Sequence, residues 1–335
     1  MSAATRAFLV AFAALALASL LNAQGLRKTA QIQPAGLERD VALALTRPLA
    51  RLSHLAYLDR PRHELQLAIG RGEVDQIDTR VILAAPLEPP ARPRVSQIPV
   101  AHRAKRKPKK PSVLGRFTRA RPLRVWVAGD SLSQVPGQAL ERAAGSAGPV
   151  DVLGVESRLD TGLTRPDLYN WFTRVRDVIS RVRPDVAVLS FGADDEHDYM
   201  SGVPAGRTIG PLGSPSWVAE YRRRVEGVTR ELNAARIYVV WLGLPITRGN
   251  GYRRGFRVVN SVLEGTARRH ARMAVYVDTW RRFSHHGRYA DYIPNAHGQL
   301  VLMRAPDGVH YEPAAGDEIA RAVVAQLRRV YDLRG

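Results

Sequence analysis

Short apolar runs alternate with longer stretches of helical periodicity over the last two thirds of the chain. Five runs have the length and continuous hydrophobicity of strands buried on both faces, namely 125–128, 150–153, 186–191, 237–242 and 274–277. Apolar residues recur at helical spacing over 134–146, 168–183, 215–234, 253–271 and 313–331. This alternation predicts an α/β domain over residues 123–335, a three-layer α/β/α sandwich with a five-stranded parallel sheet.

The first third of the chain has a different pattern. Arg6 precedes the apolar run Ala7–Leu21, as in an export signal, so residues 1–26 are expected to form a signal-anchor or a cleaved signal peptide. A buried N-terminal helix is the third interpretation. Weak helical periodicity predicts a small helical stalk over residues 27–85. Frequent prolines predict an extended, disordered linker over residues 86–122.

Composition adds a preference for anionic partners. The formal net charge is +19, and the segment 103–110 of the linker carries a dense run of Lys and Arg. Because this run follows an export signal, contact with membrane or envelope anions is favoured over nucleic acid. A solvated spacer explains the charge equally well. The chain has no cysteine, which excludes disulfides and thiolate chemistry.

Candidate chemistry lies at two places where predicted strands and helices meet. The first strand is followed by Gly129-Asp130-Ser131, which presents a serine hydroxyl at a turn into a helix. Such a serine is either a nucleophile or only a helix cap. Before the last helix stand Asp307 and His310, whose spacing lets a carboxylate orient an imidazole base. Taken alone, this pair is also compatible with two polar loop residues.

Together these segments resemble the SGNH (GDSL-type) hydrolase family, of the exported bacterial membrane-tethered type. The resemblance covers roughly residues 124–331 and implies a flavodoxin-like sheet with a catalytic triad of Ser131, His310 and Asp307. It implies that the backbone of Ser131 and of Gly162, which follows the second strand, donates to an oxyanion. The third family block, Gly-x-Asn-Asp, corresponds here to residues 192–195.

The third block departs from the family at one position. The family's asparagine is replaced by Asp194, whereas Gly192 and Asp195 match and, with Asp130, are expected to support the site. An ionised carboxylate repels an oxyanion, and loss of one donor costs about 100- to 1000-fold in rate. Three outcomes stay open: Asp194 is neutral and donates, the backbone donors of Ser131 and Gly162 suffice, or catalysis is weak.

Other polar clusters are interpreted more plainly. Adjacent residues in 194–198, including His197, are poorly placed to converge on one metal ion, so no metal and no cofactor are expected. The histidines 285, 286 and 297 are expected to face solvent or substrate. Core or pocket-wall positions are expected for Trp217, Trp241 and Trp280, and a solvated face for Arg222–Arg224.

The resemblance and the export signal together suggest a function. We expect a serine esterase or acyl hydrolase/acyltransferase acting on O-acyl esters, with glycans or lipids of the cell envelope as substrates. The protein is expected outside the cytoplasm, anchored to the membrane by its N-terminal helix or secreted after cleavage. The alternatives are a non-catalytic SGNH-like binding or scaffold protein of the envelope and, less favoured, a nucleic-acid-binding protein.

Overall fold

The computed structural model describes residues 2–23, 26, 37–55, 114–146, 148–203, 209–295 and 297–334. Near the N-terminus it contains two helices, α1 (Ala3–Leu21) and α3 (Leu37–Leu55). No helix in these described ranges is both long and apolar enough to cross a membrane. Most of the predicted linker, residues 86–113, lies outside the described residues, as does most of the predicted stalk.

A five-stranded parallel sheet forms the centre of the C-terminal domain, as predicted. In chain order its strands are β2 (Leu123–Gly129), β3 (Val150–Ser157), β4 (Val186–Ser190), β5 (Tyr238–Leu242) and β6 (Ala274–Val277). Every residue of β4 and β5 is buried, which explains why these runs are continuously apolar. The strand order is β3-β2-β4-β5-β6.

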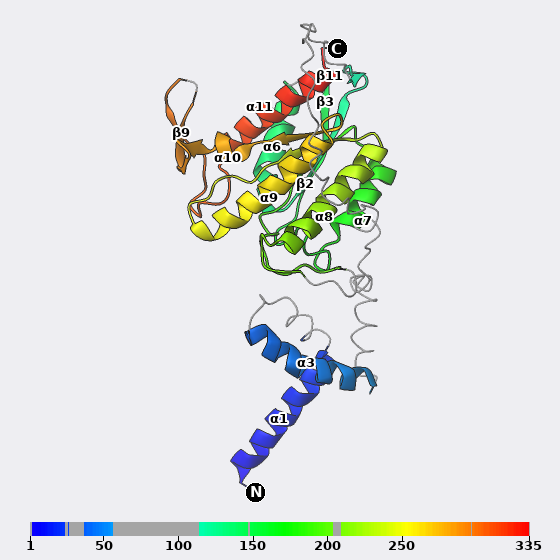
Figure 1. The fold of residues 1–335 in the computed structure, drawn as a ribbon, viewed down its shortest axis with the longest axis vertical. Helices are drawn as coiled ribbons and strands as arrows, with labels where there is room; N and C mark the ends of the chain where they lie inside the picture. Colours follow the sequence, from blue (N-terminus) through cyan, green and yellow to red (C-terminus); the bar gives the residue numbers. More distant parts are fainter. Residues whose placement is uncertain are drawn as a thin grey trace, which may run out of the picture.

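Helices cover both faces of the sheet and complete the expected three layers (Figure 1). On one face α6 (Gln134–Ala144) packs against α11 (Pro313–Val330). On the other face α8 (Pro215–Ala234) lies beside α9 (Asn250–Arg269) and α7 (Trp171–Asp177). The helix predicted over 168–183 corresponds to α7 and the π-helical turn Val178–Val182 that continues it.

The domain includes residues that the proline pattern assigned to the linker. Strand β1 (Gly115–Arg116) pairs in parallel with β11 (Tyr331–Asp332). The ring of Phe117 is buried and meets the ring of Tyr331 edge-on, with 5.4 Å between centroids. The predicted boundary at residue 123 therefore lies too far toward the C-terminus. The described part of the domain begins at Leu114. Two short strands far apart in sequence carry too little hydrophobic pattern to be predicted.

Strand order determines where chemistry can occur. The chain runs from β2 to β3 on one side and then crosses to β4 on the other side of β2, so the order reverses between β2 and β4. Loops that leave the carboxyl ends of strands diverge at such a point and open a crevice. Two small hairpins, β7 (Ser284–His285) with β8 (Arg288–Tyr289) and β9 (Tyr292–Pro294) with β10 (Leu300–Leu302), follow helix α10 (Thr279–Arg282).

Candidate active site

Ser131 lies at the carboxyl end of β2, beside the point where the strand order reverses. Gly129 ends the strand with φ +154°, and a Cβ there would lie 1.8 Å from the carbonyl oxygen of Ser190. Only glycine allows β2 to approach β4 this closely. Asp130 then caps a single 3-10 turn, Ser131–Ser133. The serine hydroxyl is therefore presented at the start of a short helix, as the sequence pattern predicted.

His310 connects the serine to a carboxylate. Its Nε2 lies 2.9 Å from Oγ of Ser131, and its Nδ1 lies 2.5 Å from Oδ2 of Asp307. Ser131 and His310 are 179 residues apart in sequence. The fold thus places the three predicted side chains in one continuous chain of hydrogen bonds, with the imidazole in the middle.

Asp307 is held as a carboxylate by its own loop. Its Oδ1 accepts hydrogen bonds from the backbone N–H of Val309 at 2.8 Å and of His310 at 2.9 Å. Burial by itself would raise the pKa of Asp307, but these N–H donors and the His310 ring outweigh it and lower the pKa to about 2. Asp307 is therefore ionised at any ordinary pH and favours the His310 tautomer that carries its proton on Nδ1.

Two arginines that the sequence did not single out hold this loop in place. Arg304 is 1% exposed, and its guanidinium donates to the carbonyl oxygens of Ile246 at 2.7 Å and of His310 at 3.2 Å, and also to that of Val309. Arg248 donates its backbone N–H to the carbonyl of Gly308 at 3.1 Å. Because all these acceptors are backbone carbonyls, no side-chain pattern in the sequence points to either arginine.

On the opposite side of Ser131, Asp130 joins the ends of β2 and β4. It is fully buried, and its Oδ2 accepts from the N–H groups of Gly192 and Ala193, each at 2.8 Å. Burial, followed by the nearby charge of Asp194, raises the pKa of Asp130 well above its usual value. The predicted supporting residues Asp130 and Gly192 thus lie together and connect the serine turn to the third block.

Gly162 lies in a segment, residues 161–167, that we call the Gly162 loop. A Cβ on Gly162 would lie 2.2 Å from Oδ1 of Asp195, so the close approach requires glycine. The same Asp195 oxygen accepts from the backbone N–H of Thr164 at 2.7 Å, and Oδ2 accepts from the hydroxyl of Tyr221 at 2.8 Å. The predicted support of the site by Asp195 therefore consists of holding this loop.

Neither expected backbone donor has a hydrogen-bond acceptor among the described residues. Across the part of the chain that the structure describes, the N–H groups of Ser131 and Gly162 make no backbone or side-chain hydrogen bond. An oxyanion site requires backbone N–H groups that are free to donate in this way.

Asp194 lies in a partly buried environment with other carboxylates nearby. Burial, and after it the charges of Asp195 and Asp160, raise the pKa of Asp194 to about 6, although the N–H of Thr161 and the His310 ring oppose the shift. Its Oδ2 is buried and has no hydrogen-bond partner among the described residues. A carboxyl group in these surroundings is half protonated near pH 6, where the protonated form can donate.

The remaining predictions have mixed outcomes. The histidines 285, 286 and 297 are exposed, and Trp217 and Trp241 are fully buried in the core. Trp280 lines a cavity of about 320 Å³ beside α9. The predicted solvated face at Arg222–Arg224 is wrong, because Arg223 is 5% and Arg224 0% exposed. The described residues contain no group of three or more His, Asp or Glu side chains suited to a metal ion.

The chain matches one protein-family model and is similar to several solved structures. Residues 124–326 match the family model described as "Protein of unknown function (DUF459)". No curated protein sequence matches the chain. Similar solved structures include a lipase/acylhydrolase from Enterococcus faecalis, at 15% identity over 61% of this chain and 95% of that one, with a TM-score of 0.44. A catalytic mutant of the acetylxylan esterase Axe2 from Geobacillus stearothermophilus is 16% identical over 65% of this chain and 96% of that one, with a TM-score of 0.42.

The predicted resemblance to SGNH (GDSL-type) hydrolases is confirmed at the level of the fold, whereas the membrane-tethered type stays a prediction. The parallel five-stranded sheet has the expected order, and the four sequence blocks meet at its carboxyl edge. Because the family match covers more than half of the chain, this protein belongs to the DUF459 family, a family described as being of unknown function.

Proposed function

We propose that the protein is a serine hydrolase or acyltransferase that acts on O-acyl esters. The observation that carries the proposal is the position of His310, whose two ring nitrogens contact Ser131 Oγ and Asp307 Oδ2. A serine hydroxyl is a weak nucleophile until a base removes its proton in the transition state. Here the base is already within hydrogen-bonding distance, and a carboxylate with a pKa of about 2 stabilises the imidazolium that forms.

The reaction proceeds in two steps through a covalent acyl-enzyme. Ser131 Oγ attacks the ester carbonyl carbon while its proton passes to Nε2 of His310, and the carbonyl oxygen becomes an oxyanion. Collapse of this intermediate breaks the bond to the leaving alcohol, which receives the proton from His310. Water or another hydroxyl then attacks the acyl-enzyme with His310 as base, which releases the acid or transfers the acyl group.

The oxyanion is stabilised by the N–H groups of Ser131 and Gly162, and by Asp194 when that side chain is protonated. Backbone donors held in advance need no reorganisation as charge develops, and each is worth about 100- to 1000-fold in rate. The glycine at 162 and its contact with Asp195 hold the second donor in place.

We propose that the substrates are esters of the cell envelope, and the N-terminal segment supports this part of the proposal. A charged residue followed by the apolar run 7–21 is typical of an export signal, and α1 leaves Phe8, Val10 and Phe12 more than half exposed. An enzyme held at the outer face of the membrane would meet acylated glycans and lipids, and the basic linker would contact their anionic groups. A phosphatase reporter fused after residue 335 tests the location, because it is active only outside the cytoplasm.

Covalent labelling tests the activity directly. The full-length protein in mild detergent is incubated with a fluorophosphonate probe and, separately, with p-nitrophenyl acetate. We expect labelling and ester hydrolysis by the native protein and neither by Ser131→Ala. Ser133→Ala is the matched control, because its hydroxyl donates to the carbonyl of Asp130 and not to His310. Undiminished hydrolysis by Ser131→Ala would refute the assignment of the nucleophile.

One observation favours a second candidate, a non-catalytic binding or scaffold protein. Asp194 stands where the family has a neutral amide, and its ionised form would repel an oxyanion above pH 6. A folded native protein that takes up no probe at pH 5.5 or at pH 8 would favour this alternative.

A further inference from the structure

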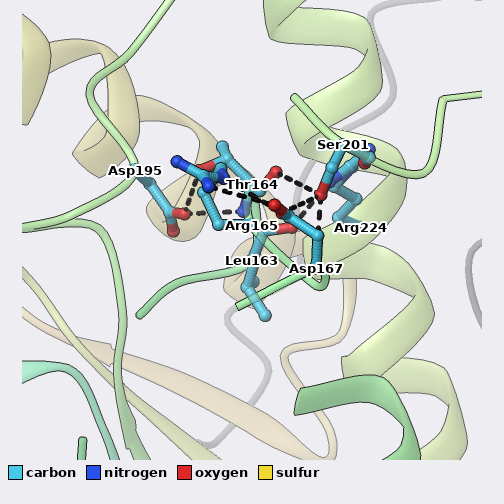
Figure 2. Close-up of polar contacts among 7 residues, drawn as sticks. All are labelled: Leu163, Thr164, Arg165, Asp167, Asp195, Ser201 and Arg224. Atoms are coloured by element: carbon cyan, nitrogen blue, oxygen red, sulfur yellow. Dashed lines mark hydrogen bonds and ion pairs between the residues drawn. The ribbon is translucent and has the colours of Figure 1, made fainter. Parts of the chain in front are cut away.

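A buried polar network lies behind the Gly162 loop and connects it to helix α8 (Figure 2). Arg224, in the middle of α8, is completely buried. Its guanidinium donates through Nη1 to the carbonyl oxygen of Leu163 and through Nη2 to that of Ser201, both at 2.7 Å. One side chain thus joins the residue after Gly162 to the segment that follows the third block.

The loop is tied to the same segment by further contacts. The backbone N–H of Ser201 donates to the carbonyl of Thr164 at 2.9 Å, and the N–H of Thr164 donates to Asp195 Oδ1 at 2.7 Å. The hydroxyl of Ser201 donates to Asp167 Oδ1 at 2.5 Å, and Asp167 also receives two hydrogen bonds from Arg165. Figure 2 shows these side chains converging between the loop and α8.

The charges in this network balance although it is buried. Three arginines face three carboxylates, because Arg224 and Arg223 share Glu220, Arg165 pairs with Asp167, and Asp195 is the third carboxylate. Arg224 donates through Nε to Oε1 of Glu220 at 3.0 Å, which fixes the direction of its planar fork. A buried charge is tolerated only when it is paired and hydrogen-bonded in this way.

We propose that Arg224 is a positioning residue for the oxyanion site. Its bonds to Leu163 and Ser201 fix the peptide groups beside Gly162, so that the Gly162 N–H points at the developing oxyanion before substrate arrives. This inference rests on the proposed hydrolase function. Arg224 does not touch the reacting atoms and acts only through the loop.

The geometry requires an arginine and not merely a positive charge. Three donors in one plane reach two carbonyls and a carboxylate from different segments at the same time. A lysine ammonium at this position cannot satisfy all three acceptors from one point. A displaced loop would aim the Gly162 N–H away from the oxyanion, and a misplacement of about 1 Å in a catalytic group costs about 100-fold in rate.

The test compares Arg224→Lys with Arg223→Lys in the full-length protein, using p-nitrophenyl acetate. Arg223 is the matched control, because it precedes Arg224 on the same helix, is buried and bonds the same Glu220. For Arg224→Lys we expect kcat to fall about 10- to 100-fold with KM changed less than about threefold, because the lost interaction belongs to the transition state. Arg223→Lys should keep kcat within about threefold of the native value, even if its melting temperature falls as much as that of Arg224→Lys.

Amide hydrogen exchange separates positioning from general destabilisation. In Arg224→Lys the amide of Thr164 should exchange faster, whereas the amides of Gly192 and Ala193, bonded to Asp130, should keep their protection. If Arg224→Lys does not fold, Glu220→Gln serves instead, because it loosens Arg224 without removing it and should lower kcat by a smaller factor.

The outcomes distinguish this inference from the function on which it rests. An active native protein whose Arg224→Lys variant keeps kcat, or loses protection equally at Thr164 and Gly192, overturns the role of Arg224 alone. If Arg224→Lys does not fold, an unchanged kcat for Glu220→Gln, or an equal loss of protection at Thr164 and Gly192, overturns the role of Arg224 instead. A native protein without esterase activity or probe labelling overturns the proposed function and the positioning role with it.

Discussion

The native protein is expected to lose esterase activity as the pH rises above 6. Replacing Asp194 by asparagine is expected to keep the enzyme active at alkaline pH. Asp194 can donate to the oxyanion only while protonated, and its pKa is raised to about 6 by burial and then by the charges of Asp195 and Asp160. Above pH 6 the carboxylate both loses its donor and repels the oxyanion. An asparagine amide at the same place donates at every pH.

The size of the effect follows from the protonated fraction. With a pKa of about 6, roughly half of the Asp194 side chains are protonated at pH 6, about a tenth at pH 7 and about a hundredth at pH 8. The ratio of kcat/KM for Asp194→Asn to that of the native protein should therefore rise about tenfold per pH unit above pH 7. It should level off at about 100- to 1000-fold, the usual value of one oxyanion donor.

The assay is the pH profile of kcat/KM with p-nitrophenyl acetate between pH 5 and pH 8.5, after subtraction of spontaneous hydrolysis. Asp160→Asn is a second variant, because the exposed charge of Asp160 contributes to the raised pKa of Asp194. Its removal should move the alkaline fall in activity to lower pH. A ratio for Asp194→Asn that stays constant from pH 6 to pH 8 would refute the reasoning and leave the backbone donors as the whole oxyanion site.

Four further outcomes are expected. Asp307→Asn should lower kcat about 10,000-fold with a normal melting curve, because the wrong His310 tautomer then faces Ser131; activity within tenfold of native would contradict the triad. Arg304→Lys should lower kcat about 100-fold, since the loop that carries the base loses its carbonyl contacts, and the rate of probe labelling checks this. Gly162→Ala should cost about 1–3 kcal/mol of stability through overpacking, with helix residue Gly251→Ala near neutral as control, measured by urea unfolding. Burial, and then the charge of Asp194, raises the pKa of Glu196 from 4.5 to about 7, so ionising Glu196 destabilises the native state as pH rises through this window; Glu196→Gln should therefore raise the melting temperature at pH 8 and leave it unchanged at pH 4.

Much of the architecture could be predicted from the sequence because it depends on local pattern. Strands buried on both faces must be apolar at every position, and each of the five runs became a strand of the sheet. The pairing of Asp307 with His310 was also predictable, because a spacing of three residues brings both side chains to one side of a loop. Ser131 followed from the same logic, since a strand that ends in Gly-Asp-Ser exposes the serine at the sheet edge.

Only the tertiary structure could show which arginines are buried. Arg222–Arg224 looks like a solvated run, yet Arg224 is enclosed because its acceptors are the carbonyls of Leu163 and Ser201 and the carboxylate of Glu220. Every residue has a carbonyl, so nothing in the sequence marks the ones that will accept from a guanidinium. Arg304 was missed for the same reason.

The sequence by itself therefore determined the order of the elements and the choice of the proposed reacting groups, because hydrophobic periodicity and short-range spacing depend on residues close together in the chain. Tertiary structure decided the distance between Ser131 and His310, the pKa of Asp194 and the support of the Gly162 loop. Each of these depends on burial and on contacts between residues far apart in the chain. Such contacts form only when folding brings together the loops at the carboxyl ends of the strands.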